Sequence, residues 1–226
     1  MELAKPCIDV GLYSHQFDEM DAFYRQDIGL AYEEFLKIGG GVRQHRYGLN
    51  GSVLKLNHSR NPLPQATAVY TGLRRVNSTL TDPVAYTDPE GIPVECVPVG
   101  YEDITGIEVT VACVDLKASG NFWEKAMEAE RVGEHRYRLA DSLIQLTPSP
   151  HGHKQTEMRA AGFRYLTVQI WDVVKEYERM IALGVEPQSA PVKLGETAKI
   201  AFIRDPDGGF IELSQRANLT GALPDN

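Results

Sequence analysis

Four separated segments of the chain alternate polar and apolar residues, and their polar residues could bind a ligand or transfer a proton. These polar residues are Glu108 with Thr110, Gln145, Tyr165 with Thr167 and Gln169, and Glu212. Side chains alternate between the two faces of a β-strand, so the polar residues of each segment share a face. If the apolar faces pack against helices, the polar faces meet in one hollow. There Glu108 or Glu212 could act as a base, with Tyr165 donating a hydrogen bond to a developing oxyanion.

Strands and helices that position these residues follow one another in a repeated order. Strands are predicted over 7–14, 106–115 and 163–170, and each precedes a predicted helix, over 20–28, 118–127 and 173–183. Asp18 and Asp172 stand where N-caps are expected, and Gly29 and Gly184 stand where helix C-termini favour glycine. Further strands are predicted over 31–38, 42–49, 52–58, 130–139, 142–148 and 199–215.

Two internal repeats support this order. Residues 51–60 align without gaps on 141–150, and residues 85–97 align on 202–214 with one residue of slack. The second pair shares an Asp-Pro-acid-Gly sequence followed by a glutamate, which predicts a tight turn in a β-hairpin. The segment from 71 to 97 has its first strand and last hairpin without a helical stretch, so this unit is predicted to be truncated.

The aromatic doublets in DAFYRQDIGL and NFWEKAM, together with the closing hairpin RDPDGGFIEL, resemble the vicinal oxygen chelate superfamily. This superfamily contains glyoxalases, ring-cleaving dioxygenases and bleomycin-resistance proteins, and the resemblance covers about residues 6–216. It implies an α+β fold of tandem βαβββ modules that pair into two cup-shaped mixed sheets with helices outside. Residues 1–100 would form a non-catalytic, partly truncated domain, and residues 101–226 a second domain with the candidate site.

The resemblance also implies a divalent metal ion, held by Glu108, Gln145 and Glu212 beside Tyr165, with Thr110, Thr167 and Gln169 near the substrate. Two carboxylates and an amide oxygen are hard ligands that suit Mg²⁺ or Mn²⁺, with Fe²⁺ or Zn²⁺ as alternatives. The histidine positions of the ring-cleaving dioxygenases carry Glu108 and Tyr165 here, which disfavours that activity. The equivalent positions of the first domain are Asp9, Lys55, Thr71 and Glu95, where a lysine would place an ammonium at the cation position.

Two classes of function remain open at this point. One is an enzyme that acts on a small oxygenated metabolite by metal-assisted proton transfer, isomerisation or lyase chemistry. The other is a binding or resistance protein of the bleomycin-resistance type, whose acidic concavity holds a cationic ligand without turnover. The two glutamates could also hold an arginine or water instead of a metal. A divergent dioxygenase and a structural or regulatory protein are further alternatives, because the fold does not fix the activity.

Composition sets the remaining expectations. The 226 residues are 42% hydrophobic and 24% charged, with a net charge of −8, which fits a globular protein without a footprint for nucleic acid. No apolar run is long enough for a membrane span and no signal peptide is recognised, so a cytoplasmic protein is expected. Three cysteines without metal-ligand spacing are expected in the core. Exposed edge strands suggest a homodimer, and His151 and His153 are expected in a solvated loop.

Overall fold

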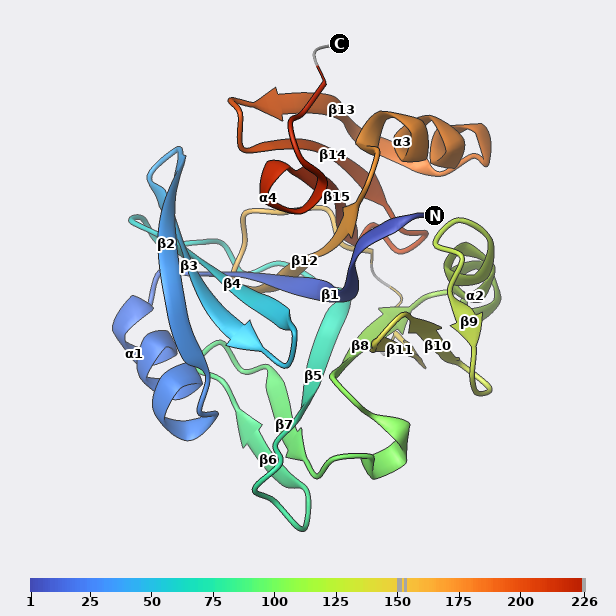
Figure 1. Ribbon diagram of the computed structural model, residues 1–226. Coiled ribbons are helices and arrows are strands. Elements are labelled where there is room, and N and C mark those ends of the chain that lie inside the picture. Colours follow the sequence, from blue (N-terminus) through green and yellow to red (C-terminus); the bar gives the residue numbers. More distant parts are fainter. Residues whose placement is uncertain (150–151, 153, 225–226) are drawn as a thin grey trace.

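Two β-sheets dominate the computed structural model, which describes residues 1–149, 152 and 154–224 (Figure 1). The eight-stranded sheet has the order β13 (Glu186–Leu194), β14 (Ala198–Arg204), β15 (Phe210–Arg216), β12 (Gly162–Ile170), β1 (Leu3–Ser14), β4 (Ser52–Ser59), β3 (Val42–Leu49) and β2 (Ala31–Gly39). The seven-stranded sheet has the order β6 (Val84–Thr87), β7 (Pro93–Val97), β5 (Tyr70–Val76), β8 (Ile107–Cys113), β11 (Ser142–Pro148), β10 (Arg136–Leu139) and β9 (Glu130–Arg131). The predicted α+β class with two mixed sheets is confirmed.

Each sheet takes strands from both halves of the chain. In the eight-stranded sheet β1 runs antiparallel to β12, so Asp9 lies opposite Thr167. In the seven-stranded sheet β5 runs antiparallel to β8, which places Arg74 opposite Glu108. The first βαβββ unit therefore pairs with the fourth, and the truncated second unit pairs with the third. The expectation that residues 1–100 and 101–226 each complete a sheet of their own is wrong, because the central strand pairing crosses that boundary.

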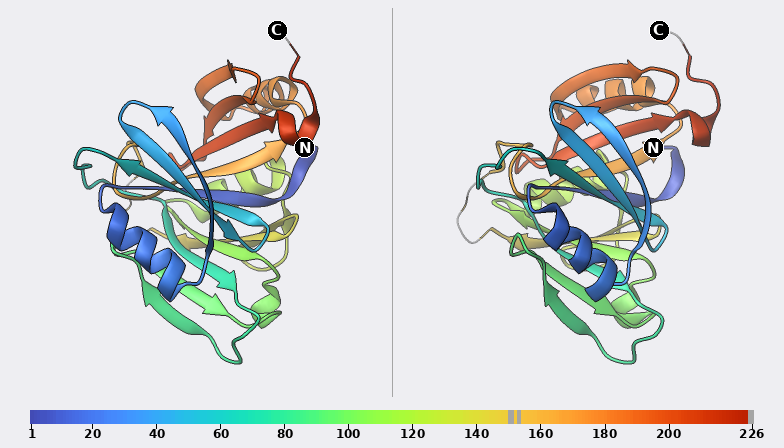
Figure 2. Two further views of the ribbon diagram at one scale, coloured as in Figure 1. Left: turned by 60° about the vertical axis from the view of Figure 1, so that its left-hand side comes forward. Right: turned by 90° about the vertical axis from the view of Figure 1, so that its left-hand side faces the viewer.

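The helices lie beside the sheets (Figures 1 and 2). They are α1 (Phe17–Ala22), which continues as a π-helix (Phe23–Asp27), α2 (Leu116–Lys125), α3 (Val173–Ala182), α4 (Ala217–Thr220) and a short 3-10 turn (Tyr101–Asp103). Three of them, α1 to α3, lie near the positions that the sequence predicts, whereas α4 and the 3-10 turn were not predicted. No helix lies between β5 and β7, so the predicted truncation is confirmed. Among the described residues, none of the helices is long and apolar enough to cross a membrane.

Helix capping follows the sequence at α3 but not at α1. The Asp172 side chain accepts hydrogen bonds from the backbone of Val174 and Lys175, and Gly184 has a φ of +84° after the helix. The predicted cap at Asp18 is wrong, because this residue lies in the first turn of α1, where no side chain caps the helix. The apolar face of α1 still packs into the core through Met20, so packing fixes this helix without a cap.

A single core joins the apolar faces of both sheets and three helices. Val10 and Leu166 of the eight-stranded sheet belong to the same buried cluster as Val109 and Ile144 of the seven-stranded sheet, and Trp123 of α2 packs with them. The three cysteines are buried and unpaired, as predicted. Because the apolar faces turn inward, the polar faces of the two sheets lie on the other side of each sheet. We call the polar face of the eight-stranded sheet cup A and that of the seven-stranded sheet cup B.

The two predicted Asp-Pro turns have the same hydrogen bonds. Oδ1 of Asp88 accepts hydrogen bonds from the amides of Glu90 (3.0 Å) and Ile92 (2.8 Å). Oδ1 of Asp205 accepts them from the second and fourth amides after it, at 2.9 and 2.7 Å. Each turn joins antiparallel strands, β6 to β7 and β14 to β15. The predicted closing hairpins are therefore confirmed, and the first aspartate of each turn organises its backbone.

Burial raises the pKa of Asp205 to about 7, so its carboxyl favours the protonated form in the folded protein. A raised carboxyl pKa contributes stability that declines as the pH rises from about 4, the unfolded value, to about 7. Over this pH range we expect the free energy of unfolding of Asp205→Asn to decrease by about 1–3 kcal/mol less than that of wild type. Urea denaturation at a series of pH values measures the slope. The exposed Asp82→Asn is the control, and identical slopes for wild type and Asp205→Asn would contradict the prediction.

Candidate functional site

The predicted site residues divide between the two cups. Tyr165, Thr167, Gln169 and Glu212 lie on β12 and β15 in cup A, whereas Glu108, Thr110 and Gln145 lie on β8 and β11 in cup B. Thr167 donates a hydrogen bond to Glu212, and Gln145 is in register with Thr110. The polar side chains of neighbouring strands thus share one face of each sheet, as the alternation within each strand predicts. The expectation of one common hollow is wrong, because β8 and β15 belong to different sheets.

Ion pairs occupy cup B. Glu108 accepts hydrogen bonds from Arg136 (2.5 Å) and Arg74 (3.2 Å), so both of its carboxylate oxygens are engaged. Arg74 also pairs with Glu95 and Glu102, each at 2.6 Å. Of the roles that the sequence left open for Glu108, holding an arginine is the one observed.

The predicted boundary segment also covers part of cup B. Glu102, which contacts Arg74, belongs to the 3-10 turn of this segment. Ile104 and Tyr101 pack against Val76, Val97 and Leu143, on the same face of the sheet as the ion pairs. Cup B is therefore partly covered by the chain itself, and its charged side chains are engaged in ion pairs beside a smaller cavity of about 250 Å³.

Cup A contains a cavity of about 610 Å³ between the β2–β3 and β13–β14 hairpins. Apolar side chains such as Leu36, Ile38 and Phe202 line its walls, and polar groups line its floor. The complete lining is Tyr13, Leu36, Lys37, Ile38, Gln44, Lys55, Tyr165, Leu194, Thr197, Ala198, Ile200, Phe202, Glu212, Ser214 and Arg216. This combination of apolar walls and a few convergent polar groups is typical of a small-molecule site.

A chain of short hydrogen bonds crosses the floor of cup A. The Lys55 ammonium donates to Thr167 Oγ1 (2.6 Å) and to Glu212 Oε2 (3.0 Å). Thr167 Oγ1 in turn donates to the same Glu212 oxygen at 2.7 Å. Lys55 is only 3% exposed, so it is held between the first and fourth units rather than in solvent. Glu212 Oε1 accepts no hydrogen bond from the described residues, and one Lys55 hydrogen is not used by this chain of bonds.

The Tyr165 hydroxyl is an oriented hydrogen-bond donor. Asn57 Nδ2 donates to the carbonyl of Leu12, which fixes its amide orientation, and it also donates to the Tyr165 oxygen at 3.1 Å. Gln44 Nε2 donates to the same oxygen at 3.2 Å. The oxygen accepts from two amides, so its own hydrogen is available to a ligand. Burial, followed by the Glu212 charge, raises the pKa of Tyr165 well above its usual value, so the hydroxyl stays neutral.

Asp9 is engaged within the sheet. Its carboxylate pairs with Lys5 at 2.6 Å and accepts hydrogen bonds from the Val53 amide (2.9 Å) and Gln169 Nε2 (3.3 Å). Gln169, predicted to contact substrate, therefore orients Asp9 and does not line the cavity. With these bonds, Asp9 neutralises Lys5 and anchors the start of β4.

The side chains present do not fit the predicted divalent metal. Among the described residues, no group of three or more His, Cys, Asp and Glu side chains is placed to hold an ion. In cup A the Lys55 ammonium lies against the carboxylate of Glu212, and in cup B two guanidinium groups bind Glu108. A fixed cation at each predicted carboxylate ligand would repel a metal. In addition, Gln145 donates its amide hydrogens to the carbonyls of His135 and Leu146.

Sequence reasoning missed several cup A residues, although a signal for them was present. Lys55 and Asn57 are two apart in β4 and therefore share a face, and Arg216 follows Glu212 and Ser214 at the same spacing in β15. Lys55 was expected in a non-catalytic domain, because the first unit was expected to pair with the second and not with the fourth. Once β1 lies beside β12, these residues enter the same cup as Tyr165.

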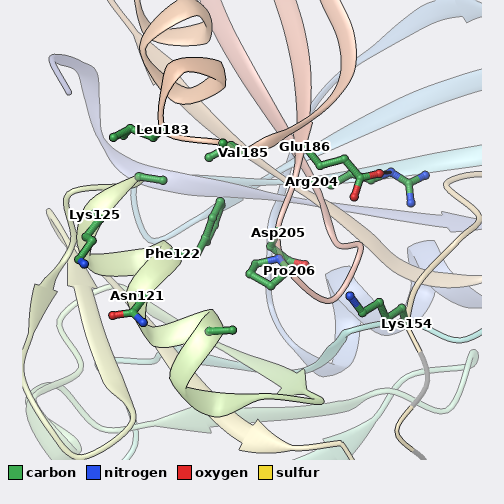
Figure 3. Close-up of a pocket in the computed structure, with 13 residues that line it drawn as sticks. Asn121, Phe122, Lys125, Lys154, Leu183, Val185, Glu186, Arg204, Asp205 and Pro206 are labelled. Carbon is green, nitrogen blue, oxygen red and sulfur yellow. Dashed lines mark ion pairs between the residues drawn. The ribbon is translucent and has the colours of Figure 1, made fainter.

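A second cavity, of about 480 Å³, lies between α2 and α3 (Figure 3). Its lining includes Phe122, Lys125 and Arg204. Arg204 already bonds Gln188 at 2.8 Å and stacks over Phe210. The other charged residues of its lining are Lys125, Lys154, Glu186 and Asp205, and this lining contains fewer polar side chains than that of the cup A cavity. His151 and His153 lie outside the described residues.

Comparison with known proteins supports the predicted family. Residues 107–213 match the sequence model of the Glyoxalase/Bleomycin resistance protein/Dioxygenase superfamily. This part of the chain is similar to that superfamily. The crystal structure of glyoxalase I from Zea mays is 15% identical, with a TM-score of 0.72 over 92% of this chain and 92% of that one. A putative dioxygenase from Bacillus subtilis is 16% identical, with a TM-score of 0.71 over 96% of this chain and 85% of that one.

At these identities the two structures show a shared fold over nearly the whole chain. The predicted resemblance to the vicinal oxygen chelate superfamily is confirmed. A match to this superfamily does not distinguish between its activities, so the function is inferred from the side chains that line cup A.

The contribution of the buried Lys55–Glu212 ion pair to stability can be tested by a double-mutant cycle. We expect Lys55→Met to lower the free energy of unfolding by about 2 kcal/mol, because Glu212 then keeps a mostly buried charge without its partner. Combining it with Glu212→Gln should restore at least half of that loss, since no isolated charge remains. Lys37→Met, at the exposed rim of the same cavity, is the control. Equal stability of Lys55→Met and wild type would show that the pair contributes nothing.

Proposed function

We propose that the protein binds a small oxygenated organic molecule in cup A, without a metal ion. The observation that carries this proposal is the hydroxyl of Tyr165, which accepts two amide hydrogen bonds and so directs its own hydrogen away from them. A carbonyl, hydroxyl or carboxylate oxygen of a ligand is the natural acceptor. Lys55 supplies a second donor on the same floor, and the apolar walls accommodate a hydrocarbon group.

The charges of cup A favour an oxygen acceptor over a cationic ligand. Of its carboxylates, Asp9 is paired with Lys5, Glu212 with Lys55 and Glu34 with Arg46. The acidic concavity expected from the sequence would require these charges to be free. A ligand oxygen, in contrast, uses donors that are already in place and does not displace a buried ion pair.

The binding proposal is tested with neutral ketones. Suitable probes are the methyl esters of phenylglyoxylate, benzoylpropionate and benzoylbutyrate, which combine a carbonyl with an apolar ring. We expect binding in the presence of EDTA, observed by ligand-detected NMR, and about fivefold weaker binding to Tyr165→Phe because one hydrogen bond is lost. Tyr47→Phe, which removes a buried hydroxyl bonded to Asp21 outside the cavity, should bind as wild type does. If no ester binds, or if binding requires added metal, the proposal fails.

A second candidate is metal-independent proton transfer in the same cup. Glu212 Oε1 is free of hydrogen bonds from the described residues, and Glu212 and Tyr165 line one cavity. In this reaction Glu212 removes a proton from the carbon beside a bound carbonyl, and the electron pair moves onto the carbonyl oxygen. The Tyr165 hydroxyl stabilises the resulting enolate, and Glu212 returns the proton to carbon. This is the metal-free form of the predicted isomerase or lyase chemistry.

Proton transfer can be followed by exchange of hydrogen for deuterium. In D₂O we expect the protein to accelerate exchange of the methylene hydrogens beside the ketone of methyl benzoylpropionate, as measured by NMR. Glu212→Gln should remove at least 90% of this acceleration, because an amide is not a base at neutral pH. Absence of acceleration in wild type, with binding intact, would leave a binding protein and exclude this reaction for the probe.

The predicted homodimer and cytoplasmic location remain proposals. The edge strand β2 exposes Phe35 and Ile38, which are 49% and 47% accessible. An exposed edge strand with apolar residues favours association with a second chain. Ile38 also lines the cup A cavity, so a second chain at β2 would lie next to the proposed ligand site.

A further inference from the structure

Arg216 is a cationic residue of cup A that forms no ion pair with the described residues. It is the last residue of β15, on the same face as Glu212, and it lines the cavity. The residue is half-buried, and in the described part of the chain its guanidinium makes no hydrogen bond and no ion pair within 4 Å. A guanidinium has five donors in a planar fork. An arginine that is partly desolvated in a cavity without an acceptor is a candidate for ligand recognition.

The charges around Arg216 do not neutralise it. Arg46 is buried on the same face, in register with Lys55, and its Nε makes no hydrogen bond. Burial and then the Arg46 charge lower the pKa of Arg216, so the two guanidinium groups repel each other. The acids that oppose this effect are Glu212, Glu34 and Asp9, which face Arg216 from β15, β2 and β1.

Each of these acids already has a closer cation. Glu212 pairs with Lys55 at 3.0 Å and Asp9 pairs with Lys5 at 2.6 Å. Glu34 lies 3.4 Å from Arg46. Apart from Lys37 at the exposed rim, Lys5, Lys55, Arg46 and Arg216 thus face three carboxylates, which leaves one positive charge, that of Arg216, without a paired acid among the described residues of a protein whose net charge is −8. A single anionic group of a ligand would complete the balance.

We infer that Arg216 binds a carboxylate of the ligand, so that the ligands of cup A are small organic acids with an apolar group and a further oxygen. This inference rests on the proposed binding function and names its ligand class. The carboxylate pairs with the guanidinium fork, the apolar group lies against Ile200 and Phe202, and the further oxygen accepts from Tyr165 or Lys55. Arg216 determines specificity in this arrangement, because a neutral analogue forms no ion pair with its guanidinium and gains no affinity from it.

The test compares each acid with its own methyl ester. Phenylglyoxylate, benzoylpropionate and benzoylbutyrate place the carboxylate at increasing distances from the ketone, so the panel needs no assumption about that spacing. We expect at least one acid to bind wild type about tenfold more tightly than its ester, the size of effect expected of a charge-assisted hydrogen bond. Arg216→Gln should abolish this preference without weakening ester binding, and Arg216→Lys should retain part of it.

Lys175→Gln is the matched control, since it removes an exposed positive charge on α3, outside the cavity. It should leave the preference for acids within twofold of wild type. Equal binding of all acids and esters by wild type, or an unchanged preference in Arg216→Gln, would overturn the inference and leave the binding proposal intact. Failure of every acid and every ester to bind would overturn both. Thermal denaturation of each variant verifies that it is folded.

Discussion

Close approach of the Tyr165 ring to the backbone of Gly11 is the constraint on which cup A depends. The two residues lie opposite each other in the antiparallel pair of β1 and β12, and a Cβ atom at Gly11 would lie 2.1 Å from the ring. Any other residue would push the ring away. Because the ring lies across β1, its hydroxyl reaches Asn57 and Gln44 on the neighbouring strands β4 and β3.

The same strand pair explains why cup A has a cation at its centre. It brings β4 of the first unit and β15 of the fourth unit to either side of β1 and β12, so Lys55 and Glu212 meet over Thr167. A lysine and a glutamate at this depth satisfy each other and leave no net charge to attract a metal. The chain thus shares the fold of the solved structures and has the ammonium of Lys55 at the centre of cup A.

Cups A and B differ because of what covers them. In cup B, Arg74 draws in Glu102 from the segment between β7 and β8, and Ile104 packs beside it. Among the described residues, no comparable segment lies over the centre of cup A, where hairpins border a cavity of about 610 Å³. Cup B is partly covered, its charges are engaged in ion pairs, and its cavity is only about 250 Å³. Cup A keeps directed donors and Arg216, which makes no ion pair within the described part of the chain, and this is why the proposed function is assigned to cup A.

The sequence by itself determined the repeated units, the turn aspartates Asp88 and Asp205, and the side of each strand on which Tyr165 or Glu212 lies. These are local properties, set by backbone geometry and by alternation within one strand. Only the tertiary structure decided which units pair, and hence that Glu212 meets Lys55 while Glu108 meets Arg74. Strand pairing joins backbone groups far apart in the chain, and alternative pairings can bury similar apolar faces, so local patterns cannot distinguish between them.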